Sequence, residues 1–311
     1  NDCLRLGKDG ESSFVAMQYY YAMTILRKFA EYKNDDEYVK QLDKQQEELG
    51  RLIQEICYDE DRFIRGFTEE GKVIGKRTDA EANMWLNPQS WAVISKVADE
   101  KQGEIIMNSV HDRLNTKYGA ILMDPPYHAE AFSGALAVIY NAGTKENSGI
   151  FSQSQGWIIL AEALLKHGDR AFEYFMENSP AAQNDRAETR VLEPYCYGQF
   201  TEGKASPNFG RSHVHWLTGT ASTVMVGCVE GILGMRPDFE GLHIEPSVPK
   251  EWGEFEITKS FRGSNLHIVI KNPGHIQSGC KKMVVNGIEV EGSYITQDML
   301  TENTEIELMM S

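Results

Sequence analysis

The sequence predicts a mainly helical fold that ends in a small antiparallel β domain. Over most of the first 235 residues, apolar side chains recur at helical spacing, and helices apolar on every side alternate with helices that carry one apolar stripe. Helices of the first kind are buried and those of the second kind are peripheral, so this alternation is typical of two concentric rings of antiparallel helices, an α/α barrel. After residue 235 the pattern changes to short β-type runs. A plain helical bundle has the same helical periodicity and stays open here.

The first third of the chain contains the clearest single-stripe helices. Ser12 or Ser13 can cap the first of them, because a hydroxyl accepts a hydrogen bond from the first free amide groups. Asn87-Pro88 marks the start of the third. The predicted helices span residues 12–32, 35–57, 89–99 and 103–117, and a hairpin over 62–74 turns at 69–71.

The central helices are the most apolar. Residues 128–140 (HAEAFSGALAVIY) and 156–165 (GWIILAEALL) are apolar almost all round, which predicts burial. Asp169 is the expected cap of the next helix, which ends at Asn178. A loop rich in Tyr, Gly and Pro follows over 186–207, and residues 216–233 are expected to form the last barrel helix.

The β domain is expected to begin after the segment 234–237 (GMRP). Asn286-Gly287 separates two β-type runs and is a strong signal for a hairpin. The predicted strands span 243–244, 255–258, 266–270, 283–285 and 288–290. We therefore expect a helical part over residues 1–235 and a C-terminal β-sandwich domain over 236–311.

Composition restricts the classes of partner. The net charge of −15 repels phosphate backbones, so we expect no nucleic-acid partner. No apolar run approaches the roughly 20 residues needed to cross a bilayer, so we expect no membrane segment. The five cysteines are odd in number and scattered, which favours free thiols in a reducing compartment and a cytoplasmic location. The opening residues NDCLRLG lack a signal peptide and a start, so we expect a fragment of a longer protein.

One polar stretch stands out between the two most apolar segments. Residues 143–157 (GTKENSGIFSQSQGW) put Lys145 and Glu146 side by side and carry four polar residues before a helix expected to start at Gly156. A loop of this polarity faces a cavity or solvent, and loops on rigid scaffolds often carry binding groups. A solvated connector is the alternative interpretation.

Several familiar signatures of catalysis or cofactor binding are absent from the sequence. It contains no GxGxxG, no Walker loop, no HExxH, no CxxC and no GxSxG. His213 and His215 are two residues apart, as a pair of metal ligands on a strand would be, but two ligands are too few for a site. We therefore expect no metal.

The remaining candidates are polar clusters at the ends of predicted helices. In an α/α barrel, loops at one end of the inner helices converge on a central pocket, where carboxylates, amides and a lysine can grip sugar hydroxyls. The aromatic residues near them can stack on sugar faces or simply pack. The polar candidates are Asp2, Lys145, Glu146, Gln153, Glu193, Gln199, Thr218 and Gly219, and the aromatic ones are Trp157, Tyr195, Tyr197 and Trp216.

These segments resemble glycoside hydrolase family 94, the inverting cellobiose and chitobiose phosphorylases. The resemblance covers essentially the whole chain, with its motifs in family order. The matching segments are NDCL at the start, LNPQSWAV at 86–93, YNAGTKENSGIF at 140–151, EPYCYGQF at 193–200, WLTGTAS at 216–222 and GMRPDFEGLHIEPSVP at 234–249.

The resemblance implies a four-part protein, of which this chain would hold the later part of an (α/α)₆ barrel and the C-terminal domain. It further implies a homodimer and no cofactor, with inorganic phosphate as co-substrate. It implies Asp2 as general acid, Lys145, Glu146 and Gln199 as sugar-binding residues, and Thr218 and Gly219 in the phosphate site.

Two further positions bear on phosphate and on the sugar. The family usually has a histidine in the phosphate site at the position of Gln153, and a glutamine donates hydrogen bonds but carries no charge. Tyr140 stands five residues before Lys145, as in the cellobiose type, although it could equally be the last core residue of its helix.

A phosphorylase needs only the acid of the two carboxyl groups that an inverting hydrolase uses, because phosphate is already an anionic nucleophile. We therefore expect phosphorolysis of a cellobiose-like β-linked glucose disaccharide to α-glucose 1-phosphate and a free sugar. The alternatives are an N,N'-diacetylchitobiose or cellobionate phosphorylase of the same family, or an inverting hydrolase with Glu146 or Glu193 as base. A non-catalytic carbohydrate-binding or truncated protein also stays open.

Overall fold

The structure is a computed structural model that describes residues 6–128 and 139–311. The chain divides into two compact units, which we describe separately. The first comprises Asn1–Trp157 and Met176–Ala221, and the second comprises Ile158–Phe175 and Ser222–Ser311. Helices dominate the first unit. The second unit combines the strands after residue 234 with helical segments that the sequence analysis assigned to the helical part.

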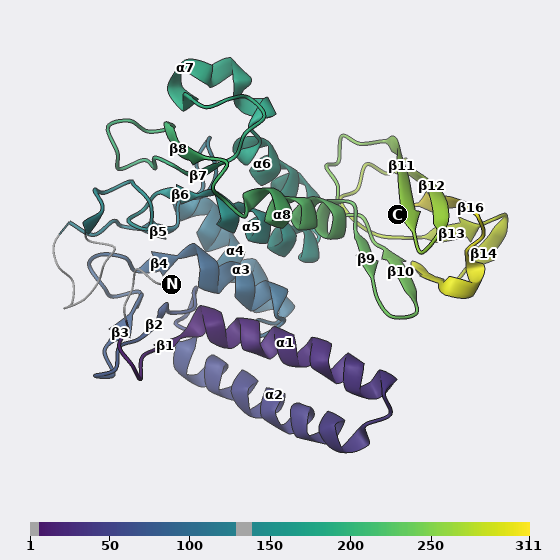
Figure 1. The fold of residues 1–311 in the computed structure, drawn as a ribbon, viewed down its shortest axis with the longest axis horizontal. Helices are drawn as coiled ribbons and strands as arrows, with labels where there is room; N and C mark the ends of the chain where they lie inside the picture. The colour runs from purple at the N-terminus through teal and green to yellow at the C-terminus, as the bar shows by residue number, and fades with distance from the viewer. Residues whose placement is uncertain (1–5, 129–138) are drawn as a thin grey trace. The chain divides into compact units, whose positions relative to one another are not determined.

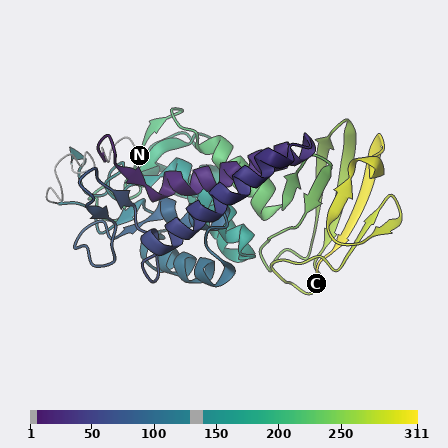
Figure 2. The ribbon, with the colours of Figure 1, turned by 90° about the horizontal axis from the view of Figure 1, so that it is seen from below.

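Two long helices open the first unit. The side chain of Ser12 caps α1 (Ser13–Tyr32), and that of Asp35 caps α2 (Asp36–Cys57) by accepting from the amide of Tyr38 at 3.0 Å. The helices lie side by side and run in opposite directions (Figures 1 and 2). Both predicted helices are confirmed, and the expected cap of the first is Ser12.

Short strands flank the next two helices. The predicted hairpin exists as β2 (Gly66–Phe67) and β3 (Val73–Ile74), and β1 (Glu11–Ser12), which was not predicted, pairs with it. Strand β4 (Met84–Trp85) pairs with β5 (Met123–Asp124).

The two helices after these strands begin three residues before their predicted starts. Helix α3 spans Leu86–Ile94, so Pro88 lies inside its first turn, where a missing N–H removes no helical hydrogen bond. Helix α4 (Glu100–Leu114) begins early because Asp99 and Gln102 form a capping box.

The remainder of the first unit carries the polar loops. Predicted helix 128–140 lies almost entirely outside the described residues. Strand β6 (Ile150–Phe151) leads into α5 (Ser152–Leu164), which begins at Ser152 and not at Gly156 as predicted. Within the predicted loop 186–207 the chain forms a short helix, α7 (Ala187–Arg190), and a strand, β7 (Gly198–Thr201). The loop is preceded by η2 (Ala181–Arg186) and followed by β8 (Ser212–His215).

The expected last barrel helix is shorter than predicted and changes its winding. Helix α8 (Thr220–Val226) begins four residues after the predicted start and continues as a π-helical segment, η3 (Gly227–Ile232). Residues 212–215, just before the predicted start, are a strand, because they pair with β7.

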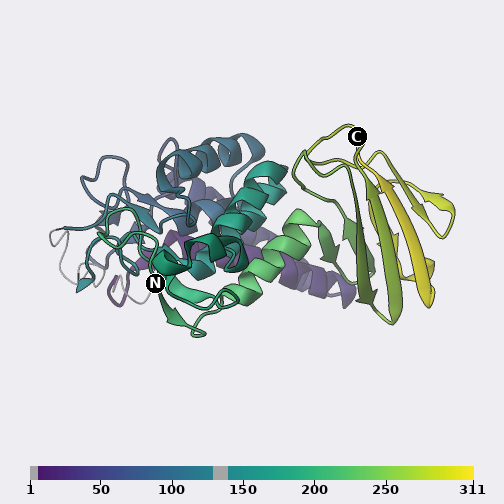
Figure 3. The ribbon, with the colours of Figure 1, turned by 90° about the horizontal axis from the view of Figure 1, so that it is seen from above.

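The second unit contains two sheets and several helical segments: α5 from Ile158, α6 (Gly168–Asn178) up to Phe175, α8 from Ser222, and η3. Asp169 lies in the first turn of α6 and accepts from the amide of Lys250 at 2.9 Å, so it is not the predicted cap. One sheet has the order β15–β10–β9, and the other has the order β11–β12–β16–β13–β14 (Figure 3). The strands are β9 (Met235–Pro237), β10 (Gly241–Ile244), β11 (Glu254–Phe261), β12 (Ser264–Lys271), β13 (Lys282–Val285), β14 (Ile288–Val290), β15 (Tyr294–Thr296) and β16 (Asn303–Met309), with η4 at Gln297–Met299.

The sequence predicts an antiparallel sheet, but the larger sheet contains one parallel pair of strands. Strands β12 and β16 pair in parallel, with Ile268 opposite Ile306. The hairpin β13–β14 turns at Asn286-Gly287, both with positive φ, and is confirmed. Strands β9, β15 and β16 were missed, the first because Pro237 suggested a break and the last because alternating Glu residues hid its apolar side.

No helix in the described part of the chain combines the length and the apolar composition that a bilayer crossing requires.

Candidate functional site

A three-stranded antiparallel sheet, β6–β7–β8, gathers most of the predicted site residues. Phe151 of β6 lies opposite Phe200 of β7, which in turn lies opposite His213 of β8. The loop 140–149, which we call the KEN loop, enters β6, and Gln153 follows that strand by two residues. Gln199 lies within β7, and Thr218 and Gly219 follow β8 by three and four residues. Segments separated by about 50 residues in the sequence thus meet on one small scaffold (Figure 1).

The KEN loop is closed by the third residue of its motif. The side chain of Asn147 is fully buried, accepts from the amide of Tyr127 at 2.8 Å and donates to the carbonyls of Tyr127 and Tyr140 at 2.9 and 2.8 Å. Gly143 donates to the carbonyl of Asn147 at 2.8 Å. Asn147 therefore shapes the loop and leaves Lys145 and Glu146 as its candidate binding groups.

The KEN loop has a strained backbone at Lys145 and at Ser148. Lys145 has φ 47° and Ser148 has φ 68°, the left-handed region that residues other than glycine seldom adopt. Such strain persists where the surrounding structure enforces it and is often associated with functional sites. Here Asn147 and the pairing of β6 enforce it.

Glu146 carries an uncompensated oxygen. Its Oε2 atom is buried and has no hydrogen-bond partner among the residues that the structure describes. A buried carboxylate oxygen left without a donor costs stability, so this atom is suited to accept a hydrogen bond from a ligand hydroxyl. The Nζ atom of Lys145 lies 5.3 Å from the centroid of the Tyr140 ring, which brings the three predicted sugar-contacting residues of this loop together.

Gln153 and Gly219 are neighbours in space. A Cβ atom added to Gly219 would lie 3.5 Å from Cδ of Gln153, so a side chain there would touch the glutamine amide. Thr218 lies beside them, and its hydroxyl contacts that of Thr220 at 2.5 Å and accepts from the Thr220 amide at 3.2 Å. Because α5 begins at Ser152, Gln153 belongs to the first turn of a helix.

The two histidines of β8 do not form a metal pair. Nε2 of His213 lies 2.7 Å from Oε1 of Glu202, and its ring stacks on Phe200 with centroids 4.9 Å apart. His215 lies opposite Gly198. Within residues 6–128 and 139–311, no group of three or more His, Cys, Asp or Glu side chains is arranged to hold a metal ion.

The buried carboxylate of Glu202 was missed by the sequence analysis. It contacts both His213 and the hydroxyl of Ser206 and joins β8 to the turn after β7. Nothing in the sequence pairs these three residues, because the contact depends on the β7–β8 register.

The aromatic candidates divide into two kinds. Trp157 is half-buried and packs against other aromatic residues, since its ring lies 5.5 Å from that of Phe14 and 5.7 Å from that of Trp91. Tyr195 and Trp216 are exposed and lie next to each other. Asp2 lies outside the described residues.

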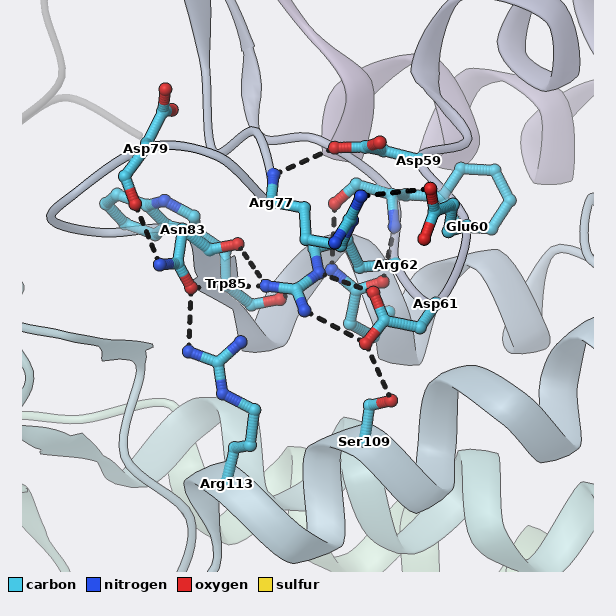
Figure 4. Close-up of polar contacts among 12 residues, drawn as sticks. Asp59, Glu60, Asp61, Arg62, Arg77, Asp79, Asn83, Trp85, Ser109 and Arg113 are labelled. Carbon is cyan, nitrogen blue, oxygen red and sulfur yellow. Dashed lines mark hydrogen bonds and ion pairs between the residues drawn. The ribbon is translucent and has the colours of Figure 1, made fainter.

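A buried charged cluster elsewhere in the first unit also escaped the sequence analysis (Figure 4). Arg62 forms a two-pronged ion pair with Asp61 at 2.8 and 2.9 Å and donates to the carbonyl of Asn83 at 2.7 Å. Arg113 donates to the side chain of Asn83 at 2.7 Å and lies 3.3 Å from Asp124. Hydrogen bonding from Arg62 lowers the pKa of Asp61. These mutual bonds indicate a structural clamp.

The second unit holds a cavity of about 320 Å³. Arg236, one of its lining residues, is paired with Glu245, which also accepts from the hydroxyl of Ser293 at 2.9 Å. None of the predicted site residues lines this cavity.

The first unit is largely helical and carries most of its polar candidate residues on a small sheet. Residues 1–234 match the family described as "Glycosyl hydrolase 94 superfamily, catalytic domain", and the chain belongs to this family. The resemblance inferred from the sequence motifs is thereby confirmed.

Several curated relatives are similar over nearly the whole chain. The chain is 33% identical over 309 residues to an N,N'-diacetylchitobiose phosphorylase of Vibrio proteolyticus, covering 97% of this chain and 38% of that protein. It is 34% identical to the protein of the same name from Vibrio furnissii, covering 94% and 36%. A solabiose phosphorylase of Paenibacillus borealis is 25% identical, with 97% and 40% covered. The chain thus spans about two fifths of the length of these relatives.

Among solved structures, a protein titled "Sialidase" shares the fold, with a TM-score of 0.60 at 15% identity. The match covers 97% of this chain and 27% of that one.

Proposed function

We propose that the complete protein is an inverting phosphorylase, which cleaves a β-linked disaccharide with inorganic phosphate into an α-sugar 1-phosphate and a free sugar. One observation carries the proposal: the KEN loop, Gln153, Gln199 and the Thr218–Gly219 turn all converge on the sheet β6–β7–β8. Similarity to three disaccharide phosphorylases supports it.

The proposed chemistry is a single displacement. A phosphate oxygen attacks the anomeric carbon from the face opposite the linkage, the bond to the bridging oxygen breaks, and Asp2 delivers its proton to that oxygen. Attack from the opposite face converts the β linkage into an α-sugar 1-phosphate. The site must hold phosphate in line and stabilise the charge that develops.

Each remaining candidate residue then has a role that its surroundings suit. Lys145, Glu146 and Gln199 would bind sugar hydroxyls, and a hydroxyl donating to Oε2 of Glu146 would satisfy an atom that has no described partner. Gln153, Thr218 and Gly219 would bind phosphate, which the contact between Gln153 and Gly219 supports. No cofactor beyond phosphate is proposed.

The donor sugar is proposed to be glucose, in a cellobiose-like substrate. Tyr140 supports this choice, because it stands five residues before Lys145, as in the cellobiose type, and its ring centroid lies 5.3 Å from Nζ of Lys145. Two of the relatives, however, act on N,N'-diacetylchitobiose by name, which makes the N-acetylated disaccharide the second candidate.

We also propose the later part of an (α/α)₆ barrel over residues 1–235 and a C-terminal β-sandwich domain over 236–311. Exposed apolar residues along α1 support further barrel helices against it, since Tyr19 is 53%, Leu26 41% and Phe29 49% exposed. A cytoplasmic homodimer completes the proposal.

Product analysis on the complete protein tests this function. Cellobiose and N,N'-diacetylchitobiose are incubated with and without phosphate, and the products are identified by NMR spectroscopy. We expect an α-sugar 1-phosphate only when phosphate is present, from one disaccharide in strong preference. Asp2→Asn serves as the control and should lower the rate by about 10²–10⁴-fold, because an amide cannot deliver the proton. Equal release of the non-reducing sugar without phosphate would indicate a hydrolase.

A further inference from the structure

One buried carboxylate lies beside the candidate site but outside the residues proposed to contact the substrates. Glu202 directly follows β7 and is 5% exposed. Its Oε1 atom lies 2.7 Å from Nε2 of His213 in β8, and its Oε2 atom accepts from the hydroxyl of Ser206 in the turn after β7. Burying a carboxylate costs stability unless its oxygens are paired. Both oxygens of Glu202 are paired, and their partners belong to two different segments of the site.

The turn over residues 203–206 is packed directly against the KEN loop. The amide of Gly203 donates to the carbonyl of Gly143 at 2.7 Å. A Cβ atom added to Gly143 would lie 2.4 Å from the amide nitrogen of Ser206. One added to Gly203 would lie 2.2 Å from the carbonyl oxygen of Ser148. The two backbones therefore touch with no room for a side chain between them, so a shift of Ser206 also shifts the loop that carries the proposed sugar-binding residues.

His213 ties Glu202 to the other segment, the chain that leads to the proposed phosphate turn, Thr218–Gly219. His213 belongs to β8, which pairs with β7. Beyond β8, the amide of Trp216 donates to the carbonyl of Tyr197 at 3.2 Å, so the chain stays attached to the β7 side until two residues before the phosphate turn. The contact between Glu202 and His213 thus holds the strand from which the phosphate turn extends.

We propose that Glu202 is a positioning residue that fixes the KEN loop and the phosphate turn relative to each other. This inference rests on the proposed function. In a single displacement the attacking phosphate oxygen has to lie in line with the anomeric carbon, so the rate depends on how accurately the two segments are placed. Glu202 contacts neither substrate in this role. Its contact with Ser206 acts on the sugar side, and its contact with His213 acts on the phosphate side.

Steady-state kinetics of four variants of the complete protein test this role. Glu202→Ala should raise the KM for disaccharide and for phosphate and lower kcat on the order of tenfold or more, because a misplacement of about 1 Å can cost up to about 100-fold. Ser206→Ala should raise mainly the KM for disaccharide, and His213→Phe mainly the KM for phosphate. Glu202→Gln should differ little from the natural protein, because the amide can accept from His213 and donate to the hydroxyl of Ser206.

Ser264→Ala is the matched control. Ser264 is buried in the second unit, and its hydroxyl lies 2.8 Å from that of Thr304. Its loss should lower the Tm and leave kcat and both KM values unchanged. If Glu202→Ala likewise lowers the Tm alone, Glu202 only stabilises the fold and the inference is overturned. It is also overturned if Ser206→Ala and His213→Phe change the two KM values alike.

Calorimetric titration separates this inference from the proposed function. In an Asp2→Asn background, which prevents turnover, cellobiose, N,N'-diacetylchitobiose and inorganic phosphate are titrated separately. About tenfold weaker disaccharide binding with Ser206→Ala, and about tenfold weaker phosphate binding with His213→Phe, supports the positioning role even if the natural protein forms no sugar 1-phosphate. Absence of that product contradicts the proposed function alone. Unchanged affinities in Glu202→Ala overturn the positioning role, and Ser206→Ala and His213→Phe decide it if Glu202→Ala does not fold.

Discussion

The first unit contains Asp61–Arg62 and Lys145–Glu146, two pairs of adjacent residues with opposite charges, which differ in their hydrogen-bond partners. In the first pair, Asp61–Arg62, Arg62 is 4% exposed and donates to the carbonyl of Asn83, and Ser109 donates to Asp61 (Figure 4). Glu146, next to Lys145, has a buried oxygen without a described partner.

This difference indicates that the charges of Asp61 and Arg62 stabilise the fold, whereas Glu146 is suited to bind a ligand. Buried Arg62 makes hydrogen bonds to Asp61 and to the carbonyl of Asn83 in place of bonds to water, so removing one of these partners lowers the stability of the fold. A strained loop with an unsatisfied carboxylate oxygen has given up stability, which a bound ligand can restore. We therefore expect substitutions in the first pair to change folding and substitutions in the second to change binding.

The largest change in stability is expected for Arg62→Met. It removes the ion pair, leaves the carbonyl of Asn83 without this donor and leaves Asp61 with the bond from Ser109 alone, so the free energy of unfolding should fall by about 2–3 kcal/mol. Urea denaturation measures it. Arg77→Met is the matched control: Arg77 pairs with Glu60 at 3.0 Å in the same cluster but is exposed, so about 0–1 kcal/mol is expected. Equal losses in the two variants would show that burial does not decide the effect.

The same ion pair should weaken in acid. Hydrogen bonding from Arg62 lowers the pKa of Asp61 below its ordinary value of 3.8, so the pair stabilises the fold above that pH and loses this contribution as the pH falls through the lowered pKa. We expect Asp61→Asn to destabilise the protein at pH 7 and to differ less from the natural protein near pH 3. A difference that grows towards low pH would contradict the assignment.

Ser148→Gly should relieve part of the strain in the KEN loop. Glycine adopts a φ of 68° without steric cost, and the substitution removes a buried hydroxyl that has no described partner. We expect a gain of about 0.5–1 kcal/mol in the free energy of unfolding, measured by thermal denaturation. Ser154→Gly, at a buried serine in the first turn of α5, is the control and should be destabilising, because glycine has a low helix propensity. A loss of stability in Ser148→Gly would show that this loop is not strained.

The smallest effect is expected for Gln153→His. A protonated histidine forms a charge-assisted bond to phosphate, so the KM for phosphate should fall a few-fold, on the acid side of about pH 5–8. The KM for the disaccharide should change little. Steady-state kinetics at several pH values measure both constants. If only the sugar KM changes, Gln153 is not a phosphate ligand.

Local signals in the sequence predicted the long elements. The cap at Ser12 and the Asn286-Gly287 turn are short-range features whose chemistry determines the structure beside them. Errors arose where a longer-range partner decides, as in the parallel pairing of β12 with β16 and in strand β8.

The candidate site divides in the same way. Motif resemblance predicted Lys145, Glu146, Gln153, Gln199, Thr218 and Gly219, because each lies in a short characteristic segment. It could not find the bond network of Asn147, the Glu202–His213 contact or the Asp61–Arg62 clamp. These contacts join loops that are distant in the sequence, so no spacing of residues along the chain predicts them.

Glu146→Gln tests most directly whether the unsatisfied charge serves binding. The amide keeps the shape of the side chain but removes the carboxylate, so kcat/KM for phosphorolysis should fall at least about 100-fold, equivalent to the loss of a strong hydrogen bond to a charged group. The free energy of unfolding should stay within about 1 kcal/mol of that of the natural protein, because no described bond to Oε2 is lost. A variant that unfolds several kcal/mol more easily yet retains its activity would contradict the account, since Glu146 would then belong to the fold and not to the site.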